Sequence, residues 1–186
     1  MAHALENRHE VLCASHTRAA LRVDITDPAS IRQLYAEVGK LDAVVSTAGR
    51  AALGALLSLT DEDFALGLSH KLMGQVNLVR LGMEHIASGG SFTLTSGIAS
   101  RRPMANAAMI SLVNAGLEGF VRSAALDLPR GVRVTAVAPG WVRETLEAMY
   151  ADPSSGLPAA EVGRSYVKAV EGVMSGQVLD AVAGAD

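Results

Sequence analysis

The sequence predicts an α/β fold built around a mainly parallel sheet. Short apolar runs alternate with segments of helical period, which is the signature of βαβ units. The chain has 186 residues, of which 49% are hydrophobic and only 4% aromatic. Small aliphatic side chains suit close packing of helices on a sheet, and the length fits one domain covering 1–186.

Charge and cysteine content exclude several other classes. The 16 basic and 19 acidic side chains give a net charge of -3 with no basic run, so we expect no nucleic-acid partner. Cys13 is the only cysteine and cannot form an internal disulfide, and five scattered histidines show no metal-ligand spacing. No apolar stretch approaches the roughly 20 residues that span a bilayer, so we expect a cytoplasmic protein without membrane contact.

Element by element, the first half begins with the end of a helix. Asp27-Pro28 then supplies an N-cap and a proline in the first turn of a second helix. The run DAVVST at 42–47 is a buried strand that ends at Ala48-Gly49. The expected order is a helix end at 2–9, strands at 11–15 and 21–25, a helix from Pro28 to about Gly39, and a strand at 42–47.

The second half opens with an acidic helix start, Thr60-Asp61-Glu62-Asp63, which suits the positive end of the helix dipole. Apolar residues three or four apart extend that helix to residue 86, and Gly89-Gly90 is expected to break the chain before the next strand. The remaining expected elements are a strand at 91–95, a helix at 106–128, a strand at 132–138, a mobile loop at 147–158, a helix at 159–172 and a strand at 177–180.

Four motifs in order resemble the short-chain dehydrogenase/reductase family. They are VDIT at 23–26, STAG at 46–49, AGLEGF at 115–120 and VTAVAPGWV at 134–142. The resemblance covers nearly the whole chain and implies a Rossmann-like, doubly wound parallel sheet. It also implies an oxidoreductase that uses NAD or NADP.

The resemblance places cofactor contacts at the carboxyl ends of the strands. It implies that Asp24 lies near the adenine, that the turn containing Ser46, Ala48 and Gly49 runs beneath the cofactor, and that Pro139 and Gly140 lie against the nicotinamide. Glycine permits such close backbone approach to a flat ligand. Taken alone, Gly49 and Gly140 are equally consistent with tight turns that bind nothing.

Compared with the family, the sequence lacks the usual first strand and its Gly-rich loop, TGxxxGxG, which holds the pyrophosphate. Cofactor binding is therefore expected to be weakened or lost. Because a buried row of unpaired amides is costly, we expect neighbouring strands to close the gap, another copy to supply a strand, or the covering elements to rearrange. A chain shortened at its start is a further alternative.

The catalytic positions also differ from the family. Aligning LEGF with the family's YxxxKxxLEGF places Ile110 at the tyrosine and Asn114 at the lysine. The family's asparagine corresponds to Lys71, and Ser96 is the nearest candidate for its serine. Our hypothesis is that Lys71 supplies local positive charge and Asn114 a hydrogen bond to the ribose, with Ser96 and Lys71 as the catalytic candidates. Sequence drift in an unused site is the alternative.

Three functions therefore remain open. The first is an NAD(P)-linked oxidoreductase, although Ile110 cannot exchange a proton and classical activity is not expected. The second is a catalytically inactive assembly or ligand-binding protein that takes a small molecule, and the third is a non-redox enzyme that reuses the site. The resemblance further implies a homo-oligomer through the helices at 61–86 and 106–128, where small residues would permit close approach. These small residues are Gly74, Gly82, Ala107, Ala108, Ala115, Gly116 and Gly119.

Overall fold

The computed structural model describes residues 2–182 and contains two parallel sheets. The main sheet has the strand order β3-β4-β5-β6, and a second sheet contains only β1 and β2. The strands are β1 (Ala14–Ser15), β2 (Leu21–Arg22), β3 (Leu41–Val45), β4 (Ile86–Thr95), β5 (Arg133–Pro139) and β6 (Val178–Ala181). The α/β prediction with a Rossmann-like arrangement is confirmed.

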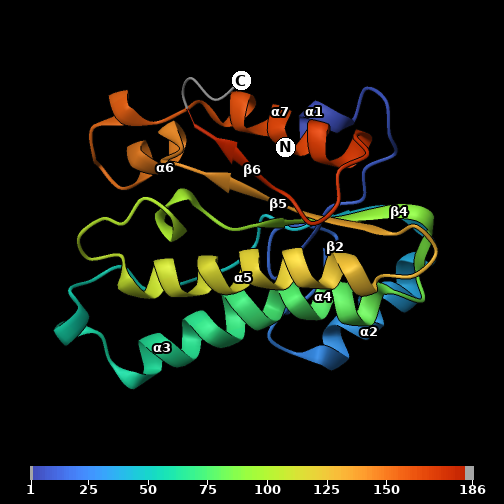
Figure 1. Ribbon diagram of the computed structural model, residues 1–186, viewed down its shortest axis with the longest axis horizontal. Helices are drawn as coiled ribbons and strands as arrows, with labels where there is room; N and C mark the ends of the chain where they lie inside the picture. Colours follow the sequence, from blue (N-terminus) through green and yellow to red (C-terminus); the bar gives the residue numbers. More distant parts are fainter. Residues whose placement is uncertain (1, 183–186) are drawn as a thin grey trace.

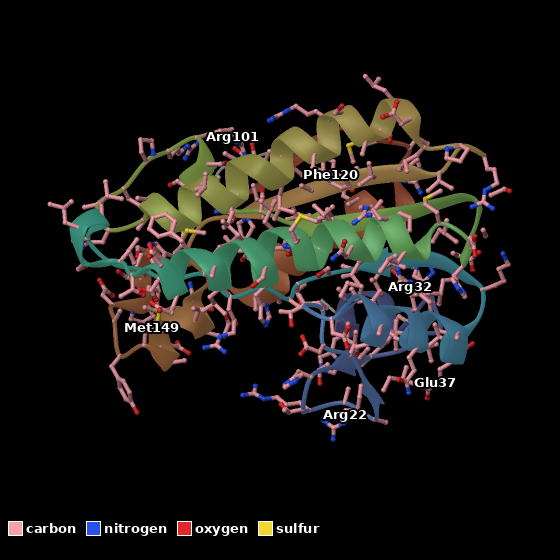
Figure 2. The ribbon with its side chains drawn as sticks, turned by 90° about the horizontal axis from the view of Figure 1, so that it is seen from below. Arg22, Arg32, Glu37, Arg101, Phe120 and Met149 are labelled. Atoms are coloured by element: carbon pink, nitrogen blue, oxygen red, sulfur yellow. The ribbon has the colours of Figure 1, made fainter. Side chains whose placement is uncertain are left out.

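Helices cover both faces of the main sheet (Figure 1). One layer contains α2 (Pro28–Val38), α3 (Asp61–Gly67), a π-helix (Leu68–Met73), α4 (Gly74–Gly82) and α5 (Ala108–Asp127). The other layer contains α1 (Ala2–Leu5), α6 (Arg143–Ala148) and α7 (Ala159–Glu171). Seen from below, the continuous helical segment formed by α3, the π-helix and α4 runs between α5 and α2 (Figure 2). Short 3₁₀ turns occur at Leu56–Ser58, Ile98–Ser100 and Pro153–Ser155.

The core is built where these layers meet the sheet. Phe92 and Leu94 of β4 are fully buried against Leu117 and Val121 of α5. A second apolar cluster surrounds Tyr35 of α2, and a third lies between α7 and the opposite face of the sheet. Burial of both faces explains why the central strands read as continuous apolar runs.

The predicted strands at 11–15 and 21–25 are wrong in length, because only two residues of each form a ladder. Within residues 2–182, β3 pairs with β4 alone and has no backbone partner on its outer edge. Val44 and Leu41 nevertheless pack into both of the apolar clusters on the α4 side. Side chains therefore bridge the gap that the backbone ladder leaves open.

The predicted helix at 61–86 is also corrected. Its helical path ends at Gly82, and Ile86 already begins β4, where it pairs with Leu41 and is 1% exposed. Gly89 and Gly90 lie inside this strand and do not break the chain. A Cβ on Gly90 would come within 2.7 Å of the Asp42 carbonyl oxygen, and Gly89 has a φ of 75°. Glycine is needed there because the strand shifts register close to β3.

Other boundaries differ less. The predicted helix end at 2–9 stops at Leu5, and the predicted loop at 147–158 contains the end of α6 and a 3₁₀ turn. Helix α6 itself was not predicted from the sequence. The predicted strand at 91–95 begins earlier, at Ile86, and the remaining elements match their predicted ranges to within two residues.

Candidate functional site

The candidate residues line up along the carboxyl edge of the strands. Asp24 follows β2, the segment 46–49 follows β3, Ser96 follows β4, and Gly140 follows Pro139, the last residue of β5. In open α/β sheets this edge is where ligands bind. The sequence-based cofactor residues are therefore placed on one side of the molecule.

Lys71 lies at the centre of this edge, on the π-helix between α3 and α4. Its Nζ donates to the carbonyl oxygens of Thr95 and Ser96, each at 3.3 Å. Among the described residues it forms no ion pair, and burial lowers the pKa of its ammonium to about 8. A Cβ on Gly49 would lie 2.9 Å from Lys71 Cγ, so the turn after β3 packs directly on the lysine stem.

Gln75 fixes the backbone around this lysine. Its amide nitrogen donates to Thr95 O at 2.9 Å and to Lys71 O at 3.3 Å, and its oxygen accepts from Thr95 N at 2.8 Å. Gln75 is fully buried. It thereby ties the π-helix to the end of β4. Gln75 was not among the candidate residues from the sequence, although it lies only four residues after Lys71.

Tyr166 reaches the same strand end from the opposite layer. Its hydroxyl lies 2.6 Å from Thr95 Oγ1, which in turn donates to Ser46 O at 2.6 Å. Desolvation raises the pKa of Tyr166, although the bond to Thr95 opposes this. Nothing in the sequence indicated this contact, because Tyr166 and Thr95 are 71 residues apart.

Asn114 and Lys71 both lie against the segment that follows β4. Asn114 is 1% exposed, and a Cβ on Gly97 would lie 2.7 Å from its Nδ2. Its Oδ1 has no hydrogen-bond partner among the described residues, and neither does Ser46 Oγ. Ile110 is partly buried in the first turn of α5 and offers no polar atom.

Ser96 is placed at the site through its backbone rather than through its hydroxyl. Its carbonyl accepts from Lys71, while its Oγ donates to the buried carboxylate of Glu118 at 3.3 Å. Glu118 also accepts from Ser100 and forms ion pairs with Arg101 and Arg122. Figure 2 shows Arg101 beside the first turns of α5, where it also pairs with Asp180 of β6.

Asp24 lies at the far end of the row, after β2. Its Oδ1 accepts from Thr26 Oγ1 and Thr26 N, and these bonds lower its pKa. The neighbouring Ile25 packs on Gly74, whose added Cβ would lie 2.9 Å from Ile25 Cδ1. This contact holds the segment around Asp24 next to Gly74, which lies three residues after Lys71.

At the other end of the row, a pocket of about 280 Å³ opens beyond Gly140. Trp141 and Arg143 line it on one side, and the loop before α7 with Glu161 lines it on the other. Within residues 2–182 no group of three or more histidine, cysteine or acidic side chains could hold a metal ion. In that same range no helix is long and apolar enough to cross a membrane.

Comparison with known proteins gives matches over most of the chain. The family model described as enoyl-(acyl carrier protein) reductase matches residues 1–170. The crystal structure of the protein lin1944 from Listeria innocua superposes with a TM-score of 0.91 at 37% identity, covering 96% of this chain and 90% of that one. A small-chain dehydrogenase solved in complex with NADPH gives a TM-score of 0.78 at 28% identity, covering 88% of this chain and 82% of that one.

Versicolorin reductase 1 of Aspergillus parasiticus is 33% identical over 147 residues, covering 75% of this chain. The fold and the row of motifs define an α/β protein with a Rossmann-like arrangement. This chain belongs to the short-chain dehydrogenase/reductase family. It spans 56% of the length of versicolorin reductase 1.

Proposed function

We propose that the chain supports NAD(P)H-dependent reduction of a carbonyl compound, with Lys71 acting at the carbonyl oxygen in place of the family's tyrosine. The observation that carries this proposal is a buried ammonium at the carboxyl edge of the sheet that pairs with no carboxylate of residues 2–182. Ile110 leaves the usual position without a proton donor. Lys71, held at the carbonyl oxygens of Thr95 and Ser96, can supply a proton or positive charge there.

The residues present fit a nicotinamide nucleotide. Ser46 Oγ and Asn114 Oδ1 are buried polar atoms with no hydrogen-bond partner in the described part of the chain, and such atoms are costly unless a ligand or water bonds to them. Gly49 has a φ of 144°, a backbone conformation that residues other than glycine rarely adopt. Asp24, Ser46, Ala48, Gly49, Asn114, Pro139 and Gly140 would hold the nucleotide. When bound, the reduced nicotinamide supplies a hydride.

The contribution of the protein is then positioning and a proton. An acid works best when its pKa is close to the working pH, and the pKa of Lys71 of about 8 meets that condition. The two backbone carbonyls hold Nζ in place, and Gln75 holds the Thr95 carbonyl. Asn114 would orient the ribose through its unpartnered oxygen.

The test is turnover of aldehydes and ketones with NADPH or NADH. We expect kcat/KM to fall as the pH rises through about 8, because the acid loses its proton. Lys71→Met should lower kcat on the order of 10²- to 10⁴-fold. Lys168→Met, at an exposed lysine on α7, is the matched control. Unchanged turnover in Lys71→Met would refute the role of the lysine.

A ligand-binding protein without turnover is the second candidate. Ile110 and the engagement of the Ser96 hydroxyl with Glu118 favour it, because neither side chain is then free to act on a carbonyl. This candidate predicts that NADPH raises the melting temperature while no carbonyl compound is reduced.

We also propose a homo-oligomer through the face formed by α3, the π-helix and α5. Leu68, Met73 and Leu112 are each at least 40% exposed on these elements, and Ala115 and Gly119 are exposed beside them. Gly74, Gly82 and Gly116 instead pack against neighbours within the chain, so only part of the small-residue stripe is available. Light scattering should show that Leu112→Glu dissociates the oligomer and that Val173→Glu, after α7, does not.

A further inference from the structure

Lys71 has a second chemical capacity that proton donation does not use. Protonated, it can donate to an oxygen, whereas its neutral form is a primary amine with a free lone pair. A lysine becomes nucleophilic when it is desolvated and lacks an anionic partner. We infer that Lys71 is an imine-forming residue, which captures small aldehydes and ketones covalently at the carboxyl edge of the sheet.

The surroundings of Nζ support this inference. Its two hydrogen bonds go to uncharged backbone oxygens and are long, at 3.3 Å, so little is lost when the nitrogen gives up its proton. Lys71 as a whole residue is of intermediate exposure, so it is not sealed inside the core. The π-helix that carries it is a type of distortion that often marks functional sites.

The charged and titratable groups around Lys71 do not hold it in the protonated form. His70 adjoins it on the π-helix, Arg50 follows Gly49, and Tyr166 lies beyond Thr95. Glu118 is on the other side of Ser96 and is already bonded to two arginines. None of these groups forms an ion pair with Nζ among the described residues, and burial lowers the pKa of the ammonium to about 8.

The covalent step is a condensation without any change of oxidation state. The nitrogen lone pair attacks the carbonyl carbon and forms a C–N bond, giving a carbinolamine after proton transfer through solvent. The hydroxyl then leaves as water, and a C=N bond remains. One carbonyl compound and one amine give one imine and one water, so no oxidant or further reactant is needed.

The chain offers a sharp test because it has only three lysines, and Lys40 and Lys168 are both exposed. The intact protein is incubated with butyraldehyde and sodium cyanoborohydride, without nucleotide, at several pH values from 6.5 to about 9.5. Peptide mass mapping then gives the rate of alkylation at each lysine. A lysine with the ordinary pKa of about 10.4 is neutral in only about 1% of molecules or fewer at pH 8.

We expect Lys71 to be alkylated at least tenfold faster than Lys40 and Lys168 at pH 8, with a rate that rises through that pH. Lys71→Arg should abolish the fast adduct, because a guanidinium remains charged and forms no such imine, while Lys168→Arg should leave it intact. Alkylation of Lys71 at or below the rate of the two exposed lysines would overturn the inference. Because no nucleotide is present, this outcome is independent of whether the chain reduces carbonyl compounds.

Discussion

At the scale of single residues, Lys71 makes folding pH-dependent in an unusual direction. Its pKa in the folded chain is about 8, against an ordinary 10.5, so the unfolded chain binds more protons between these values. The free energy of unfolding therefore rises with pH across that window, and the full penalty of burying the charge applies below pH 8. Most paired lysines behave in the opposite way.

The prediction is that Lys71→Met stabilises the protein at pH 7 by roughly 1–3 kcal/mol, since methionine keeps most of the stem and removes the charge. The gain should shrink as the pH approaches 10.5. Urea unfolding at pH 7, 8.5 and about 10 measures it, with Lys168→Met as the control. A gain that does not change with pH would show that the charge carries no penalty.

Glu118 is a second residue whose side chain connects several elements of the fold. Its buried carboxylate joins the end of β4 to α5, and through Arg101 to Asp180 of β6. Removing one partner from a buried network leaves the others unsatisfied. Glu118→Gln should therefore lower the free energy of unfolding by about 1–3 kcal/mol.

The matched comparison for that change is Arg122→Gln. The Arg122 side chain is 54% exposed, so its ion pair with Glu118 should contribute less than about 1 kcal/mol. Thermal or urea unfolding of both variants measures the difference. Equal losses in the two variants would argue against a network centred on the carboxylate.

At the scale of elements, the glycines of the helical layer separate into two kinds. A Cβ on Gly82 would lie 2.6 Å from Tyr35 Oη and 3.0 Å from Phe92 Cε1, both on rigid rings, whereas a Cβ on Gly119 would meet nothing within 4 Å. Gly119→Ala should stabilise α5 by about 0.5–1 kcal/mol, and Gly82→Ala should destabilise the chain by about 1–3 kcal/mol. Urea unfolding at a concentration where the chain is monomeric measures both changes.

The elements also show what the sequence could and could not predict. The strand after Gly131 and the helix after Asp27 could be predicted from the sequence. The strand is a mostly apolar run, and the helix has an N-cap and a proline in its first turn. The end of the helix at Gly82 was not readable, because Ile86 continues the apolar spacing although it belongs to β4. Periodicity cannot distinguish these cases when a helix passes into a strand within a few residues.

The candidate site likewise contains residues that could be predicted from the sequence and contacts that could not. Motif positions such as Gly49 and Asn114 could be read from the sequence, because each is tied to a strand end or a helix register. The bonds from Gln75 and Tyr166 to Thr95 could not, because they depend on how two helical layers meet one strand. Whether Ser96 presents its hydroxyl or its carbonyl likewise depends on the buried Glu118.

At the scale of the whole molecule, the main feature is that the described strands form two separate sheets. Leu41 and Val44 pack into both clusters on the α4 side, so the apolar core is continuous where the ladder is not. Within residues 2–182 the outer backbone edge of β3 is open. An open edge can pair with another chain unless it is covered.

Amide hydrogen exchange tests the state of this edge. Ser46 N donates to Thr93 O, so by alternation along a parallel strand the amide of Val45 points away from β4. We expect the Val45 amide to exchange much faster than that of Val137 in the middle of β5, because the latter lies between two paired strands. Protection of Val45 that increases with protein concentration would instead show that a second copy pairs with β3 in solution. Protection independent of concentration would contradict the open edge.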